Sequence, residues 1–522
     1  MVKVNESKTT FTVFTLSTKG HNVTLNYNGQ WLKEEQNPIY LGITFDPRLT
    51  WKAQLQNNKT KAKLRMCLMR KLAGTHWGAN QSVLKKMYVG RIRPTLEYGM
   101  ASTCTASKTQ QNNRNKIQNQ AMRIMTGAMC STPISCLETI TGLQSLEERS
   151  EIKVLTQAAK FKRMNDHPMH KMTKSPLKTR LKRTSFVKES RRLEKQEPGF
   201  MDQIPEPIHQ TSCIPLWKEK SIPTIITSIP GITNKESQPD IVRKNISMDH
   251  IESHYEPDSW TRAYTDGSAE EALKNVGAGV FIAYEGKETK LALATGKYSN
   301  NYKAESVAMG KAIEEMLKEA DKIKPNIVIL TDALSVLEAL GNPKKKDLNP
   351  LREKIARLMS KSKVVFQWIP AHCGIPGNEI ADKLAKEGAS LEQDDRKTTY
   401  QEAKTIIKRN SKKNWLDSHR DYNKKDPYHH LSREDQVIIF RLRTGHNKLH
   451  SHLKRLNLCP SDACLCGHTP MTAEHILQDC HNFNDIRKAH WPQDTPFHQK
   501  ILGDLLDLRK TADFIRETKI AI

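Results

Sequence analysis

The sequence predicts an α/β domain at residues 258–390, built on a mixed five-stranded sheet with flanking helices. Three runs rich in β-branched and apolar residues open this domain, and helical patterns then alternate with two further runs. That order is typical of a mixed sheet covered by helices. A mainly helical region at 1–165 precedes the domain, and a small helical tail at 396–522 follows it.

Each element of the domain has a sequence signal. The strands are expected at Trp260–Gly267, Val276–Tyr284, Thr289–Thr295, Ile327–Leu330 and Val364–Ile369, and the helices at Asn301–Ala320, Ala333–Leu340, Leu351–Met359 and Asn378–Glu387. Asn378 is a residue type that caps helix starts, and Gly388 is one that ends them.

The region 1–165 carries fewer strand signals. Strands are expected at Phe11–Leu16 and Ile39–Phe45, and basic helices at Trp51–Arg70, Gln81–Arg93, Gln111–Met129 and Leu143–Met164. This composition suits a module that holds nucleic acid, although a plain helical domain remains an alternative. Residues 166–257 lose apolar periodicity, and Met169–Phe200 has ten Lys/Arg against three Asp/Glu. This segment is therefore predicted to be a basic, partly disordered linker.

The whole chain is strongly basic, with 83 Lys+Arg against 57 Asp+Glu and a net charge of +26 over 522 residues. Such a charge favours a polyanionic partner, because neutralised phosphates release counterions. Most of the ten cysteines are scattered, which argues against a disulfide scaffold. No signal peptide and no apolar run of membrane-spanning length is recognised. A nuclear or cytoplasmic location, with no membrane partner, is therefore expected.

Four acidic residues stand at positions where a sheet could bring them together. Asp266 and Asp332 end two predicted strands, Glu305 lies on the apolar face of a helix, and Asp382 lies in the first turn of the last helix. Clustered carboxylates resist ionising together. Two Mg²⁺ ions (or Mn²⁺) would relieve that repulsion, because hard cations take oxygen ligands. A site for metal-dependent phosphodiester cleavage is therefore predicted.

A histidine accompanies the acids. His372 lies in the segment QWIPAHCGIPGNEIAD, in a loop rich in Pro and Gly just before the helix that carries Asp382. A histidine near two metal ions can carry protons or assist product release. A purely structural loop histidine is the alternative.

The segments TDGS, AES, LTDALSVL and WIPAHCGIPGNEIAD resemble, in this order, the landmarks of type one ribonuclease H. The resemblance implies cleavage of the RNA strand of RNA–DNA hybrids. It implies Asp266, Glu305, Asp332 and Asp382 as metal ligands, with His372 assisting. Substrate contacts are expected at Ser268, Asn301 and Asn378, and Asn301 stands four residues before Glu305, where the family has a minor-groove contact. Hybrid recognition would then rest on helix shape and 2′-hydroxyls.

The C-terminal region contains a possible metal-ligand set. Cys464, Cys466, His475 and Cys480 follow the spacing C-x-C-x₈-H-x₄-C, which suits a tetrahedral structural zinc. Cys459, His468 and His481 are nearby substitutes that would change the ligand set, and four unrelated residues in a loop-rich tail are the other alternative.

A second resemblance concerns the flanking regions. VNESKT, YLGITFDPRLTWKAQL and RIRPTLEYGMAS resemble the palm end and thumb of reverse transcriptases from jockey-type non-LTR retrotransposons, and RLRTGH, CLCG and TAEHILQDC resemble the tail of the same elements. The family's Tyr-Ala-Asp-Asp box should stand just before VNESKT. The resemblance implies a thumb remnant without polymerase activity and a nucleic-acid-binding zinc knuckle.

The function expected from the sequence is a two-metal ribonuclease H in a retrotransposon-derived protein that also holds nucleic acid through its basic regions. Two alternatives stay open. One is an inactive remnant that only binds nucleic acid. The other is a two-metal DNA nuclease of related fold.

Overall fold

The computed structural model describes residues 5–175, 184–197, 199, 204–207, 223–233, 237–270, 274–284, 286–319, 321–342, 345–393 and 396–522. The chain divides into two units, and each is built from separate segments. The first contains Met1–Gln157, Leu177–Leu193 and Arg409–Ile522, and the second contains Ala158–Pro176 and Glu194–Lys408. Among the described residues, no helix is both long and apolar enough to span a bilayer.

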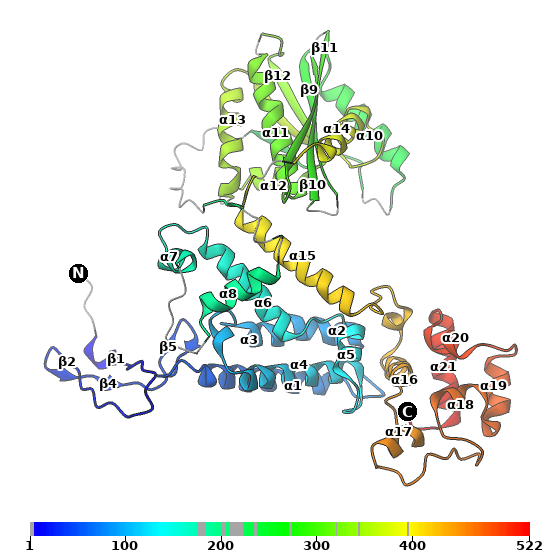
Figure 1. Ribbon diagram of the computed structural model, residues 1–522. Coiled ribbons are helices and arrows are strands. Elements are labelled where there is room, and N and C mark those ends of the chain that lie inside the picture. Colours follow the sequence, from blue (N-terminus) through cyan, green and yellow to red (C-terminus); the bar gives the residue numbers. More distant parts are fainter. Residues whose placement is uncertain are drawn as a thin grey trace. The chain divides into compact units, whose positions relative to one another are not determined.

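The second unit is organised around a six-stranded mixed sheet with the order β11-β10-β9-β12-β13-β8 (Figure 1). Five of its strands are those predicted, and they span Trp260–Glu270 (β9), Lys274–Tyr284 (β10), Lys287–Gly296 (β11), Asn326–Thr331 (β12) and Lys363–Trp368 (β13). The sixth, β8 (Thr224–Ile226), pairs in parallel with β13. The expected number of five strands is therefore wrong, because the segment predicted as a linker supplies an edge strand.

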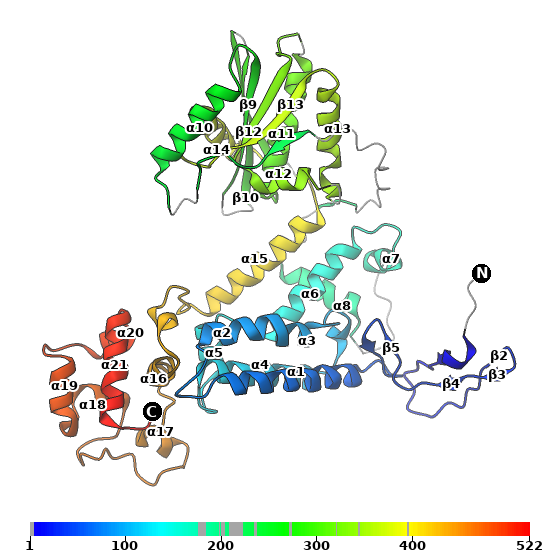
Figure 2. The same cartoon turned by 180° about the vertical axis from the view of Figure 1, so that it is seen from behind.

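Helices cover both faces of this sheet (Figures 1 and 2). One face packs against α11 (Asn301–Lys318), α12 (Leu334–Leu340) and α13 (Asn349–Met359), and its core includes Val280, Ile329 and Phe366. The opposite face packs against α14 (Pro376–Ser390) and α10 (Asp240–His254). The 166–257 segment thus contributes a helix as well as a strand to this unit.

Helix α10 is apolar on the side that faces the sheet. The sequence did not predict a helix there. Ile251 and Tyr255 lie in one core with Val365 and Ile369. The Tyr255 hydroxyl donates to Gln367 Oε1 at 2.8 Å. The apolar residues of this basic segment are isolated and show only a weak helical periodicity, so the helix could not be predicted. Its packing partners supply the stabilisation.

Two glycines let α14 approach the sheet at backbone distance. Gly277 and Gly279 are two residues apart on β10 and therefore face the same side. A Cβ at Gly279 would lie 2.0 Å from Ala381 O, and one at Gly277 would lie 2.1 Å from Ala385 O. Any side chain at either position would push α14 away from the sheet, together with the Asp382 that it carries.

The first unit is mainly helical. It begins with short strands, namely β1 (Thr10–Phe11), β2 (Asn26–Tyr27), β3 (Gln30–Trp31), β4 (Lys33–Glu34), β5 (Ile39–Tyr40) and β6 (Ile43–Thr44). The single strands expected at Phe11–Leu16 and Ile39–Phe45 are wrong. In the second case Leu41 and Gly42 adopt positive φ of 48° and 75°, so that the chain turns and forms the hairpin β5–β6.

The helices that follow agree in place with those predicted from the basic, apolar-periodic segments. They are α1 (Lys52–Leu72), α2 (Gln81–Met87), the π-helical turn η2 (Tyr88–Ile92), α3 (Arg93–Glu97), α4 (Lys108–Thr126), α5 (Ile134–Thr141) and α6 (Leu146–Phe161). Helix α8 (Phe186–Gln196) lies in the predicted linker. The short α5 was not expected.

The C-terminal region packs into the same core as these N-terminal helices. It comprises α15 (Tyr400–Ser418), η6 (Pro427–His430), α16 (Arg433–Thr444), α17 (His450–Arg455), α18 (Ala473–Gln478), η7 (His481–Phe483), α19 (Asn484–His490), α20 (Phe497–Leu502) and α21 (Leu505–Thr518). Tyr428, Ile439 and Phe440 share a core with Met66 and Met125. The regions expected as a separate remnant and tail therefore form one unit.

Buried arginines of α16 stabilise this junction. The Arg433 guanidinium donates to Gly74 O at 2.9 Å and to Ile124 O at 2.8 Å, and it also contacts Met125 O. Carbonyls in the last turn of a helix have no partner within the helix. Arg433 satisfies them at the end of α4, so that α16 closes the N-terminal helical bundle.

Candidate active site

The sheet register brings Asp266 and Asp332 together. Strands β9 and β12 are parallel neighbours, and Thr265 pairs with Thr331. Asp332 follows Thr331 directly, so the two carboxylates emerge side by side. The first and fourth strands of the domain are thus neighbours. Asp266 does not end its strand, however, because β9 continues to Glu270 and Asp266 pairs with Gly279.

Glu305 reaches the same point from helix α11. The carboxylate oxygens of Asp266, Glu305 and Asp332 offer ligand atoms that all lie within 4.8 Å of one another. Gly267 permits this approach, because a Cβ there would lie 2.8 Å from Glu305 N and 2.9 Å from Ala304 Cβ. The Gly267 N–H also hydrogen-bonds to the carboxylates of Asp266 and Glu305.

The three carboxylates are strongly perturbed. Burial, followed by repulsion from Asp332 and Asp382, raises the pKa of Asp266 to about 8. Burial and the charges of Asp266 and Asp332 raise the pKa of Glu305 well above its ordinary range. Burial also raises the pKa of Asp332, although His372 opposes this. The cluster therefore resists carrying its full negative charge unless a cation is present.

This cluster fits a hard divalent cation. Its donors are all carboxylate oxygens, the ligands that Mg²⁺ and Mn²⁺ prefer. Glu305 Oε2 is buried and has no hydrogen-bond partner. A buried carboxylate oxygen without a donor is costly, and a bound cation would remove that cost.

The fourth predicted acid lies beside this group. Asp382 is on α14, is buried, and contributes to the raised pKa of Asp266 and of Asp332. Its Oδ2 accepts a hydrogen bond from Lys386 Nζ at 2.5 Å. Three of the acids therefore lie close enough together to share a metal ion, and Asp382 lies at their border. Its partner Lys386 was not predicted from the sequence. The i, i+4 spacing on a helix is a signal that could have identified it.

The remaining predicted residues surround the cluster. His372 is exposed and has a left-handed backbone with φ 49°. Asn301 is the first residue of α11, and its Nδ2 lies 3.4 Å from Glu305 Oε1. Ser268 is half-buried on β9, two residues after Asp266 and therefore on the same side of the strand.

Asn378 has a different position from the one expected. The N-cap of α14 is Ile375 and the helix begins at Pro376, so Asn378 is its third residue and not its cap. The Asn378 side chain instead hydrogen-bonds to Asp332 and lowers the pKa of that carboxyl, against the stronger effect of burial. Asn378 Oδ1 is buried without a partner.

The loop that carries His372 rests on the helix supplied by the predicted linker. Cys373 is buried in the same core as Ile251 of α10. Gly374 has φ 89°, and a Cβ there would lie 3.4 Å from Lys244 Cδ. The 3.4 Å contact of Cys373 Sγ with Pro370 O completes this packing. Helix α10 thus supports the loop of His372. The sequence of residues 258–390 alone could not indicate this support, because α10 lies outside that range.

A second cluster lies in the first unit. Cys464, Cys466, His475 and Cys480 offer ligand atoms that all lie within 4.8 Å of one another. Cys464 Sγ and Cys480 Sγ are 3.7 Å apart, and Cys466 Sγ lies 3.2 Å from His475 Nε2. Two thiolates bound to a tetrahedral zinc at about 2.3 Å would be about 3.8 Å apart, so the sulfur positions fit zinc.

Hydrogen bonding prepares this histidine as a ligand. His475 Nδ1 lies 3.0 Å from Thr469 Oγ1, which leaves Nε2 directed at Cys466. Such an orienting partner is typical of metal-bound histidines. The other candidates lie outside the cluster. Cys459 Sγ donates to Ser461 O at 3.1 Å, and His468 and His481 line an open depression of about 430 Å³ beside His475.

Comparisons with known proteins concern residues 258–390. Residues 258–390 match the family model described as RNase H. Among solved structures, RNase H1 from Halobacterium salinarum NRC-1 aligns at 21% identity over 25% of this chain and 97% of its own length, with a TM-score of 0.21. The N-terminal RNase H domain of a Mycobacterium tuberculosis protein, fused to maltose-binding protein, aligns at 20% identity over 25% and 94%, with a TM-score of 0.20. The family match supports an RNase H domain at residues 258–390.

Proposed function

We propose that this protein hydrolyses the RNA strand of RNA–DNA hybrids at the site formed by Asp266, Glu305, Asp332 and Asp382. The observation that carries the proposal is the buried carboxylate cluster, whose members raise one another's pKa within a domain that matches RNase H. Mutually repelling acids are costly to keep in a fold, and a bound cation is what would offset that cost.

Two Mg²⁺ ions at this site would activate a water and stabilise the leaving 3′ oxygen. The chain's own residues prepare that chemistry. Asp266, Glu305 and Asp332 would hold the cations from separate elements, and Asp382 would complete the set from α14. The Asn378 amide fixes the Asp332 carboxylate. The products of this hydrolysis are a 5′-phosphate and a 3′-hydroxyl.

The exposed histidine and the surrounding polar residues serve the substrate. His372 accepts or returns a proton at its imidazole nitrogen, on a loop held by α10. Ser268 and Asn301 contact the backbone of the hybrid, whereas the buried Asn378 acts on Asp332. Its A-like shape and 2′-hydroxyls would be recognised instead of a base sequence.

The test is an incubation of the purified protein with Mg²⁺ and labelled RNA–DNA hybrid, RNA–RNA duplex and DNA–DNA duplex. We expect the RNA of the hybrid alone to be cleaved, and Asp332→Asn to abolish cleavage. Absence of hybrid cleavage would favour a binding protein without activity. Preferential DNA cleavage would favour a nuclease of related fold.

We also propose that Cys464, Cys466, His475 and Cys480 bind a structural zinc ion. The support is the sulfur separation and the orientation of His475. With three thiolates and one imidazole the site would be closed to water, as structural zinc sites are.

The flanking regions, we propose, derive from a jockey-type retrotransposon, with residues 1–165 related to the palm end and thumb of its reverse transcriptase. Sequence resemblance supports this origin. The helical character of the described part of 1–165 is compatible with it.

A further inference from the structure

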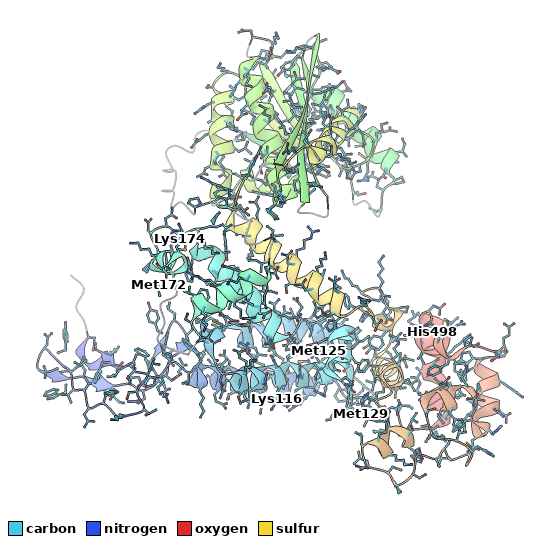
Figure 3. The ribbon with its side chains drawn as sticks, in the orientation of Figure 1. Lys116, Met125, Met129, Met172, Lys174 and His498 are labelled. Carbon is cyan, nitrogen blue, oxygen red and sulfur yellow. The ribbon has the colours of Figure 1, made fainter. Side chains whose placement is uncertain are left out.

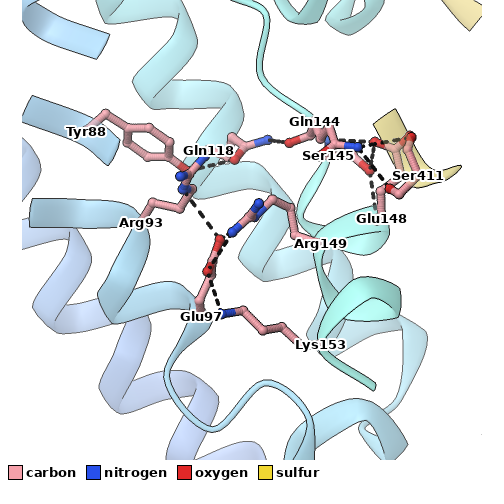
Figure 4. Close-up of polar contacts among 10 residues, drawn as sticks. All are labelled: Tyr88, Arg93, Glu97, Gln118, Gln144, Ser145, Glu148, Arg149, Lys153 and Ser411. Atoms are coloured by element: carbon pink, nitrogen blue, oxygen red, sulfur yellow. Dashed lines mark hydrogen bonds and ion pairs between the residues drawn. The ribbon is translucent and has the colours of Figure 1, made fainter. Parts of the chain in front are cut away.

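Residues 47–137 of the first unit are almost free of negative charge. This stretch contains sixteen lysines and arginines and one acidic residue, Glu97. Glu97 is enclosed by cations and pairs with Arg93 at 3.4 Å, with Lys153 at 3.4 Å and with Arg149 through two hydrogen bonds (Figure 4). Burial alone would raise the pKa of Glu97, but these cations hold it below its ordinary value. The only acid of the stretch is thus neutralised internally.

Helix α1 concentrates part of this charge in one line. Its 21 residues include no acid. Lys52, Lys59, Lys63 and Arg70 are seven, four and seven residues apart, and at 3.6 residues per turn they fall within about 20° of one line along the helix. The stripe extends for about 27 Å at 1.5 Å per residue.

The packing of α1 leaves this stripe open. Its buried side chains include Ala62, Met66 and Met69, which lie to one side of the stripe. Lys52, Lys63 and Arg70 are exposed and Lys59 is half-exposed. In the described part of the chain, none of the four side chains forms an ion pair or a hydrogen bond.

Other helices of the bundle add charge of the same sign. Lys108 and Lys116 of α4 are exposed, and α4 is likewise free of acidic residues (Figure 3). Arg65 is different, because its guanidinium donates to Arg91 O at 2.6 Å and serves the packing of the bundle. In the described part of the chain the four cations of the stripe therefore form no ion pair, and neither α1 nor α4 contains an acid.

We propose that the stripe Lys52–Lys59–Lys63–Arg70 binds the sugar-phosphate backbone of a nucleic-acid duplex. A duplex carries one charge per about 1.7 Å of its axis, so a 27 Å line of cations faces a continuous row of phosphates. A regular, straight row of charges complements this regular polyanion. Lysine and arginine on phosphates position a duplex without reading its bases, so this binding is independent of sequence.

This proposal deepens the expected binding to nucleic acid by naming a surface outside the RNase H domain, and it does not depend on cleavage. The test therefore measures binding of the full-length protein without added divalent metal. Fluorescence anisotropy with a labelled RNA–DNA hybrid and a DNA duplex would be recorded over a range of salt concentrations.

Two single substitutions on α1 form a matched pair. Lys63→Gln removes a cation of the stripe, whereas Lys61→Gln removes an exposed cation two residues away, on nearly the opposite side of the helix. We expect Lys63→Gln to reduce the slope of log K against log salt by about 0.9, and to weaken binding roughly five- to tenfold at 0.1 M salt. Lys61→Gln should leave both nearly unchanged, and Lys63→Arg should restore the wild-type values.

Thermal unfolding of each variant checks that the fold is retained, and the Arg variant separates charge from side-chain shape. Equal losses for Lys61→Gln and Lys63→Gln, or no loss for either, would overturn the proposal. So would competition by polyglutamate as effective as that by duplex, because it would indicate an acidic protein as the partner. Failure of hybrid cleavage would leave the binding result unaffected, so the two proposals are tested separately.

Discussion

The RNase H domain and the helical stretch 47–137 manage charge in opposite ways. Residues 258–390 contain twenty Lys/Arg and eighteen Asp/Glu, whereas residues 47–137 contain sixteen and one. In the domain, the informative charges are a few buried acids that repel one another. In the helical stretch, they are exposed cations, and the four of the stripe form no ion pair among the described residues. In the two proposals, the chemistry would depend on local charge crowding and the binding of nucleic acid on charge excess.

The largest effect is expected when one of the crowded acids is removed. Asp266→Asn should reduce cleavage roughly thousandfold, because losing a metal ligand removes several kcal/mol of transition-state stabilisation. The same change should raise the melting temperature of the metal-free protein, since it removes a repelling buried acid. Asp258→Asn, an exposed acid just before β9, is the control and should change neither value. A drop in both activity and metal-free stability would contradict the crowding argument.

The next prediction concerns the cluster of Cys464, Cys466, His475 and Cys480. A zinc ion there would stabilise the helical unit independently of the catalytic unit. Cys464→Ser should release zinc and lower the melting temperature of that unit, because binding energy at a structural site is folding energy. Metal analysis and calorimetry would measure both effects. Cys459→Ser, outside the cluster, should retain zinc. Zinc retained in Cys464→Ser would exclude this ligand set.

The next prediction addresses the boundary of the catalytic unit. Ile251→Ala on α10 removes a fully buried side chain and should cost about 2–5 kcal/mol. Ile241→Ala on the same helix removes a side chain that is 62% exposed and should cost well under 1 kcal/mol. Calorimetry would show the difference. Equal effects would mean that α10 does not belong to the folded unit.

The last prediction concerns pH. The pKa of Asp266 is raised from 3.8 to about 8 in the folded, metal-free protein. The folded state thus holds this proton more tightly than the unfolded state. The resulting stability is complete below the ordinary value near 3.8, and it is lost as pH rises toward about 8.

Without metal, the melting temperature of the catalytic unit should therefore be lower at pH 8 than at pH 5. Added Mg²⁺ should reduce this difference, because the cation replaces the proton. Melting curves at both pH values, with and without Mg²⁺, provide the measurement. Asp266→Asn should flatten the dependence, and an unchanged profile in that variant would assign the effect to other groups.

Much of the catalytic domain could be predicted from the sequence, because its signals are local. The five core strands and four helices follow from the periodicity of their apolar residues. The neighbouring positions of Asp266 and Asp332 depend on the pairing of β9 with β12, which the structure shows. Strand β8 and helix α10 could not be found, because they depend on partners more than a hundred residues away, such as Val365 for Thr224. The place of Asp382 at the border of the acidic cluster required the position of α14, which is set by Gly277 and Gly279.

The shared core of the N-terminal and C-terminal regions has a consequence for synthesis. The core formed by the helices up to Phe161 also contains Tyr428 and Phe440, so it is incomplete until these residues have been made. Roughly 280 residues separate these partners, so at about 5–20 residues per second a ribosome needs roughly 15–55 s between them. During that interval the nascent chain exposes apolar surface, although the catalytic unit has already emerged. A premature stop before Tyr428 would leave a complete RNase H domain attached to an open, aggregation-prone bundle.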